Sequence, residues 1–181
     1  TVGRLFLSLI AGVWGTVALL GSEPFLVKDI NTTLEASGSK PYGFCVIGST
    51  VYFTAGTPTT GYELWKSDGT VAGTVLVKDI NPGSGSSNPS YLMAMGSDLY
   101  FAANDPSHGT ELWRSDGTGE GTVLVKDIIP GSAGSAPHSL TAVGGVLYFA
   151  AYDPANGSEL WTSYGTATST FLARDIRSGS D

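Results

Sequence analysis

The sequence repeats with a period of 48 residues, and this period constrains the fold more than any other feature. The segment ELWKSDGTVAGTVLVKDI at 63–80 returns as ELWRSDGTGEGTVLVKDI at 111–128 and, more altered, as ELWTSYGTATSTFLARDI at 159–176. A period of this length indicates that one supersecondary unit is stacked several times, because one unit cannot bury its apolar faces alone. The chain is therefore predicted to be a tandem array.

Each unit predicts four short β-strands. In the middle copy they cover 90–95, 99–104, 110–115 and 122–128, separated by turns rich in Gly, Asp, Pro and Ser. Tyr, Phe, Trp, Val and Leu dominate the strands, and helical periodicity is absent from the repeats. Apolar residues on both faces of LYFAA and TVLV are typical of sheets covered on both sides. The predicted fold class is all-β, with tandem four-stranded antiparallel blades.

The size of the unit favours a β-propeller-like arrangement, since a blade is a four-stranded sheet of about 40–50 residues. Three units are fewer than the 4–8 blades of a ring, so we expect an incomplete ring within a longer protein. A β-trefoil, which also has twelve strands, is the alternative. The predicted divisions are 1–22 signal peptide, 23–40 leading strand and linker, 41–80 repeat 1, 81–128 linker and repeat 2, 129–176 linker and degenerate repeat 3, and 177–181 start of the next linker.

The two segments that precede the first repeat carry separate predictions. FLVKDI at 25–30 reads as a fourth strand without the three before it, and we expect it to complete another blade, which a trefoil would not require. Arg4 followed by an uncharged run over 5–20 is typical of a secretory signal peptide, and the run is shorter than most membrane spans. An uncleaved anchor or a buried segment are the alternatives. We therefore expect a secreted or cell-surface protein without a membrane span in the mature chain.

Composition excludes some classes of function. The formal net charge of −7 offers no basic stripe for nucleic acid. Cys45 is the single cysteine, so an intrachain disulfide is excluded, and Met93 and Thr141 at the matching positions indicate a buried filler. His108 and His138 recur in no other copy and have no second ligand at metal spacing. No catalytic or cofactor-binding fingerprint is present, so no catalytic residue and no cofactor are predicted.

At Glu63–Thr70 and Glu111–Thr118 the chain resembles the bacterial repeat family named for its ELWxxDGT signature. The resemblance extends over residues 25–176. Repeat 3 departs from the signature, with Tyr164 in place of the Asp and Ser169 in place of the second Gly. The resemblance implies a large exported or surface array, of a kind often predicted to form propellers, and it brings no enzymatic activity with it.

The recurring residues have a structural and a functional interpretation. Asp68 and Asp116 are calcium candidates, but shaping of the Asp-Gly turns is favoured because each turn has few carboxylates. The Trp residues could stack on a sugar, with blade core favoured, and the Asp of each KDI segment is expected to bond a neighbouring blade or linker. The recurring structural positions are Glu63, Trp65, Asp68, Gly69, Asp79, Glu111, Trp113, Asp116, Gly117, Asp127, Glu159, Trp161 and Asp175.

These patterns predict an exported, non-catalytic repeat protein that serves as a binding, adhesion or structural scaffold. Every strong motif is shared by all copies, which suits a scaffold better than an active site. A compact carbohydrate-binding domain and a propeller-type polysaccharide-active enzyme are the alternatives, the latter needing carboxylates found in one blade only. A surface glycan or a protein is the class of partner considered.

Overall fold

The computed structural model describes residues 26–32 and 38–179, where it contains β-strands and no helix. The first sheet contains β1 (Tyr42–Ile47), β2 (Thr50–Thr57), β3 (Gly61–Ser67) and β4 (Val75–Lys78). The second contains β5 (Ser90–Met95), β6 (Asp98–Asp105), β7 (Gly109–Ser115) and β8 (Val123–Lys126). The third contains β9 (His138–Val143), β10 (Val146–Asp153), β11 (Gly157–Ser163) and β12 (Thr170–Arg174). The predicted all-β class with four-stranded antiparallel units is confirmed.

Each sheet is an antiparallel meander built from one repeat. The strand orders are β1-β2-β3-β4, β5-β6-β7-β8 and β9-β10-β11-β12, with the same register in each central hairpin. Phe53 lies opposite Trp65, and the equivalent Phe and Trp residues pair in the other two sheets. A trefoil pairs strands of different repeats in a barrel, whereas each sheet here takes all its strands from one repeat. The trefoil alternative is therefore wrong.

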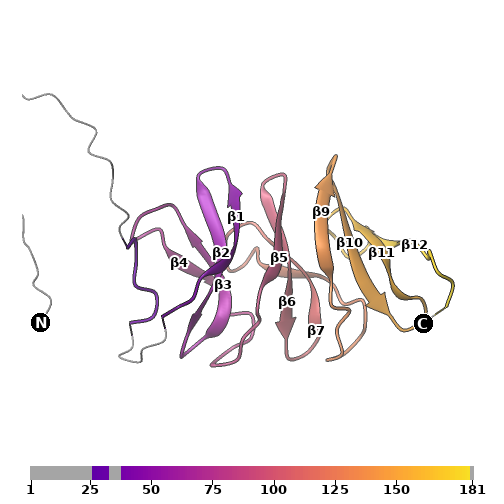
Figure 1. Cartoon of the computed structure of the whole chain (residues 1–181), viewed down its shortest axis with the longest axis horizontal. Coiled ribbons are helices and arrows are strands. Elements are labelled where there is room, and N and C mark those ends of the chain that lie inside the picture. Colours follow the sequence, from indigo (N-terminus) through magenta and orange to yellow (C-terminus); the bar gives the residue numbers. More distant parts are fainter. Residues whose placement is uncertain (1–25, 33–37, 180–181) are drawn as a thin grey trace, which may run out of the picture.

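The three sheets stand one after another in chain order (Figure 1). Consecutive sheets come close at their first strands, where β1 contacts β5 and β5 contacts β9. Successive sheets therefore meet face to face, and the middle sheet, β5 to β8, is covered on both sides.

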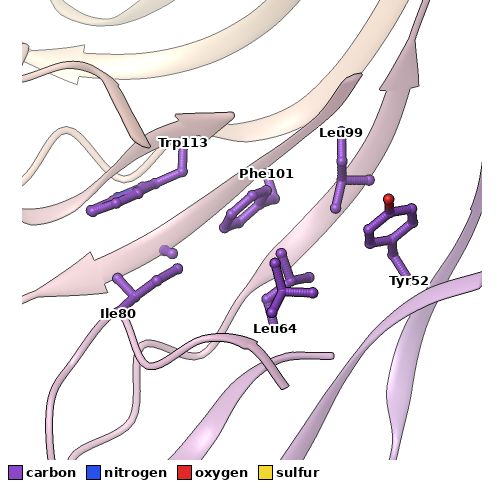
Figure 2. Close-up of a cluster of buried hydrophobic side chains, with 8 residues drawn as sticks. Tyr52, Leu64, Ile80, Leu99, Phe101 and Trp113 are labelled. Atoms are coloured by element: carbon purple, nitrogen blue, oxygen red, sulfur yellow. The ribbon is translucent and has the colours of Figure 1, made fainter. Parts of the chain in front are cut away.

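The apolar core lies between consecutive sheets. Figure 2 shows the first of these clusters, in which Trp113 lies beside Ile80, and Leu99 lies beside Tyr52. One half comes from repeat 1 and the other from repeat 2, and an equivalent cluster joins repeats 2 and 3. We call the face that a repeat turns towards the next repeat its trailing face. The buried members of the first cluster are Tyr52, Leu64, Val77, Ile80, Leu99, Phe101, Ala103 and Trp113.

The described residues 26–30 of the predicted leading strand form no strand. β4, β8 and β12 each pair with the third strand of their own sheet, and no such neighbour pairs with residues 26–30. Their contacts nevertheless match those of a fourth strand. Lys28 Nζ donates to Thr74 O at 2.7 Å, as Lys78 Nζ does to Thr122 O, and Ile30 packs against the cluster around Trp65.

The predicted signal peptide at 1–22 lies outside the described residues. Within the described part of the chain, no helix is long and apolar enough to cross a membrane.

Candidate functional site

The glutamate of each ELW segment holds the linker that leads to the next repeat. The Glu63 carboxylate is fully buried and accepts hydrogen bonds from Ile80 N at 3.0 Å, Ser87 N at 2.8 Å and Ser87 Oγ at 2.5 Å. Glu111 accepts hydrogen bonds from Ser135 N and Ser135 Oγ in the same way, and from Ile129 N, which corresponds to the Asn81 N–H that also donates to Glu63. Glu159 accepts from Ile176 N and Arg177 N. These carboxylates are therefore occupied by the backbone of the linkers.

Burial sets the proton affinity of Glu63 and Glu111. It raises the pKa of Glu63 and Glu111 above 4.5, even though the hydrogen bonds to each carboxylate act in the opposite direction. Each carboxylate is surrounded by donors from one linker. A group enclosed in this way is suited to fixing the chain, because little room is left for a substrate.

We expect stability to rise on mild acidification. The raised pKa of Glu63 and Glu111 means that the folded chain binds their protons more tightly, so the free energy of unfolding increases as pH falls from neutral to 4.5. Hydrogen bonds from Thr70 and Thr118 lower the pKa of Asp68 and Asp116 below 3.8, so these two groups remove stability at lower pH. Urea unfolding at pH 7, 5 and 3 checks both signs. A continuous loss of stability from pH 7 to 5 would contradict the first.

The Asp-Gly turns are held by their own side chains. Asp68 Oδ1 accepts from Thr70 N at 2.9 Å and from Thr70 Oγ1 at 2.7 Å, and Asp116 makes the same two bonds to Thr118. A Cβ added at Gly73 would lie 2.0 Å from Asp68 Oδ1, so the second glycine makes room for the carboxylate. No group of three or more His, Cys, Asp or Glu side chains that could hold a metal ion occurs in the described residues. The geometry is that of a turn.

The third repeat replaces both members of this pair together. Tyr164 takes the place of the aspartate, and Ser169 takes the place of the glycine. Thr166 N now donates to Ser169 Oγ at 3.1 Å, where the earlier repeats use the Asp carboxylate. The two departures are therefore one compensated exchange. Sequence comparison within the chain could have detected it, because both positions change in the same copy.

This compensation can be tested in repeat 2. Gly121→Ser alone is expected to lower the melting temperature by about 2–4 °C, because its Cβ would lie 2.1 Å from Asp116 Oδ1. Adding Asp116→Tyr recreates the third repeat and is expected to return at least about half of that loss. Thermal melts of the two single variants and the double variant measure the coupling. Strictly additive changes would contradict it.

The tryptophans of the three ELW segments lie in the cores. Trp65, Trp113 and Trp161 are 8%, 7% and 7% exposed, so they offer no open platform for a sugar. Within the described residues, each indole Nε1 is buried without a hydrogen-bond partner.

The aspartates of the KDI segments lie where the last strand joins the linker. Asp79 Oδ2 accepts from Gly83 N at 3.2 Å, which ties the aspartate to the linker. The second oxygen, Oδ1, is buried without a partner in the described structure, and Asp127 and Asp175 repeat this feature.

Basic side chains connect consecutive repeats through main-chain acceptors. Lys78 Nζ donates to Thr122 O at 2.7 Å, and Lys126 Nζ donates to Thr170 O at 2.8 Å. Lys66 Nζ donates to Gly117 O of the next turn at 2.8 Å. These charge-assisted bonds were not anticipated from the sequence, because the partners are backbone carbonyls.

The single cysteine and the two histidines form no common site. Cys45 is half-buried against the first cluster, and burial raises the pKa of its thiol, which leaves less of the reactive thiolate. His108 Nδ1 pairs with Asp105 Oδ2 at 2.8 Å in a hairpin turn. His138 contacts Ala136 O and the ring of Tyr91.

An open cleft of about 420 Å³ lies beside the β2–β3 hairpin of repeat 1. Its lining includes Asn31, Lys40, Gly56, Thr57, Tyr62 and Ser86, and Lys40 is the charged residue among the described ones that line it. We call it the repeat-1 cleft. Tyr62 also packs near Tyr42, with ring centroids 6.0 Å apart. Sequence reasoning missed this site, because it concentrated on residues that recur.

The positions around this cleft differ from copy to copy. Gly56 corresponds to Asn104 and Tyr152, and Tyr62 corresponds to Thr110 and Ser158. Repeat 1 therefore places its large residue on the third strand, whereas repeats 2 and 3 place theirs on the second. The charged positions differ as well: Lys40 corresponds to Asn88 and Ala136, and Thr57 corresponds to Asp105 and Asp153.

The comparisons with known proteins identify no family for this chain. A scan against protein-family models finds no match, and a search of curated proteins finds no matching relative.

Proposed function

We propose that this chain belongs to an exported, non-catalytic scaffold of β-propeller type, which serves binding, adhesion or a structural role at the cell surface or in the medium. The sheets described above are blades of a longer ring in this proposal. The resemblance to the ELWxxDGT repeat family and the predicted signal peptide at 1–22 support export.

The uncovered trailing face of the third sheet carries the proposal. Tyr148 is 37% exposed, whereas Tyr100 and Tyr52 at the same position are 3% and 7% exposed. Leu160 is 36% exposed, whereas Leu112 and Leu64 are fully buried. The residues that bury these side chains in the first two interfaces come from the following repeat. A further unit of the same kind would cover this face in the same way.

The engagement of the recurring polar residues supports a scaffold without catalysis. Glu63 and Glu111 bind linker backbone, Asp68 and Asp116 shape turns, and Lys78 bonds the next repeat. Catalytic carboxylates need access to a substrate, and an acid–base pair needs a defined separation across it. The shared residues of these repeats have other partners, so they serve the architecture.

Adding one more repeat after the third tests whether the third sheet accepts a further blade. A second copy of residues 81–128 fused after Ile176 continues the period, and we expect it to bury Tyr148 and Leu160. Hydrogen exchange of the amides in β10, β11 and β12 should slow by at least about 10-fold, because local opening would then break a packed interface. The chain of natural length is the control. Unchanged exchange would show that the third sheet does not accept a further blade.

Absence of turnover is tested separately. The chain is incubated with a panel of neutral and acidic polysaccharides, and release of reducing ends is measured over a day. We expect no release above that from a heat-denatured sample. Release that persists through purification and disappears in a single carboxylate variant would overturn the non-catalytic assignment.

A further inference from the structure

The repeat-1 cleft has the composition of a small-ligand site. A ligand cleft typically combines an apolar wall with a few placed polar groups. Tyr62 supplies the aromatic wall, and Ser86 supplies a hydroxyl. Ser86 Oγ accepts from Tyr62 N at 2.9 Å, so its O–H remains a donor. This combination suits the hydroxyl groups and the apolar face of a sugar ring.

The differences between repeats give the cleft its aromatic wall and its charge. Gly56 has no side chain where repeats 2 and 3 carry Asn104 and Tyr152, and the Tyr62 ring takes that place: a Cβ added at Gly56 would lie 3.1 Å from atoms of this ring. At the next position, Thr57 stands where the other repeats carry Asp105 and Asp153. Repeat 1 therefore has an uncharged threonine at a position where the other two repeats have a carboxylate.

A lysine side chain adds a positive charge at the same cleft. Lys40 lines the cleft and corresponds to the uncharged Asn88 and Ala136. Among the lining residues that belong to the described ranges 26–32 and 38–179, none is a carboxylate, although the chain as a whole carries a net charge of −7. An acidic protein that places a lysine and removes an aspartate at one cleft attracts a negative group to that place.

We propose that the repeat-1 cleft binds an acidic sugar, with the sugar carboxylate next to Lys40 and the ring against Tyr62. A hydroxyl group of the sugar bonds Ser86. This inference rests on the proposed scaffold function and names its ligand class.

The test uses the whole chain and an oligomer of galacturonic acid as the probe. The methyl ester of the same oligomer is the matched neutral probe, because it keeps the backbone and masks the carboxylates. In titration calorimetry at low salt, we expect the acid oligomer to bind at least about 10-fold more tightly than the ester. Raising the salt concentration should reduce this difference through screening.

Thr57→Asp is the decisive variant. Asp105 Oδ1 accepts from Ser107 N and His108 N in the matching turn, so an aspartate is compatible with this hairpin. We expect this variant to keep its melting temperature and to lose at least about 10-fold in affinity for the acid oligomer. Thr168→Asp, an exposed position in repeat 3, adds the same charge elsewhere and should bind normally.

Lys40→Asn serves as a second variant, since Asn88 holds the same left-handed backbone with φ of 48°. It too should lose at least about 10-fold in affinity. Equal binding of acid and ester, full affinity in both cleft variants, or no binding of either oligomer overturns the proposal. None of these results affects the outcome of the blade-extension experiment, so failure of the ligand is distinguishable from failure of the scaffold.

Discussion

Glu111→Ala is expected to lower the free energy of unfolding by about 3–5 kcal/mol, the largest single effect we foresee. The side chain is fully buried and accepts hydrogen bonds from Ile129 N, Ser135 N and Ser135 Oγ. Alanine would leave these donors buried without an acceptor and would leave a cavity between β7 and the linker. Urea unfolding followed by circular dichroism at pH 7 measures the loss.

Two further variants test whether the buried carboxylate of Glu111 causes this loss of stability. Glu120→Ala removes a glutamate from an exposed turn and should change stability by less than about 0.5 kcal/mol. Glu111→Gln keeps the shape and one acceptor, and we expect an intermediate loss of about 1–3 kcal/mol. If alanine and glutamine at this position were equally tolerated, the linker would be held by something other than the carboxylate.

Gly117→Ala is expected to destabilise the chain by about 1–3 kcal/mol more than Gly69→Ala. The two glycines have the same backbone conformation, with φ of 89° and 88°, so both variants carry the same left-handed penalty. They differ in their surroundings. A Cβ at Gly117 would lie 2.3 Å from Tyr52 Oη of the preceding repeat, whereas a Cβ at Gly69 has nothing within 4 Å. The difference between the two variants therefore isolates the contact between repeats.

Tyr52→Phe provides the matched rescue. Removing the hydroxyl frees the space that a Cβ at Gly117 needs, so the double variant should recover most of the excess loss relative to Gly69→Ala. Urea midpoints of the four variants give the coupling energy. A zero coupling energy would mean that repeats 1 and 2 do not pack in solution as they do here.

The strands could be predicted because their signal is local and is repeated. In the middle copy the predicted strands at 90–95 and 110–115 coincide with β5 and β7 to within one residue. The last strand was predicted to reach Ile128, but β8 ends at Lys126. The reason is that Ile128 turns into the next core, where it packs with the cluster around Trp161.

The linkers were harder to interpret, because composition describes only what the backbone can do alone. GSGSS at 83–87 and GSAGS at 131–135 have the composition of linkers, yet Ser87 and Ser135 are buried against Glu63 and Glu111. The available signal was the constant spacing of 24 residues from each glutamate to its serine. Residues 26–30 show the opposite case, in which a strand-like sequence forms no strand. Their sequence is that of a strand, but strand pairing requires a neighbour that the sequence of the segment cannot supply.

The repeat-1 cleft could not be predicted from the recurring residues, because the residues that distinguish it do not recur. Recurrence identifies the residues that build every unit, whereas Lys40, Gly56, Thr57 and Tyr62 are notable only where they break the pattern. Their significance depends on proximity, which the fold supplies by bringing the linker beside the hairpin. Differences between copies are thus the more informative signal for function, once the positions are known to be neighbours.

The lysine bonds between repeats have a consequence for how such a chain evolves. Lys78 and Lys126 recognise the main-chain carbonyls of Thr122 and Thr170, and every residue type presents that carbonyl. A gene duplication that inserts a whole unit would therefore create a working junction at once, without any compensating substitution in the neighbour. Selection could then alter the inserted copy freely at its hairpin turns. Arrays of this kind can lengthen by recombination of whole units while the hairpin turns of each copy diverge.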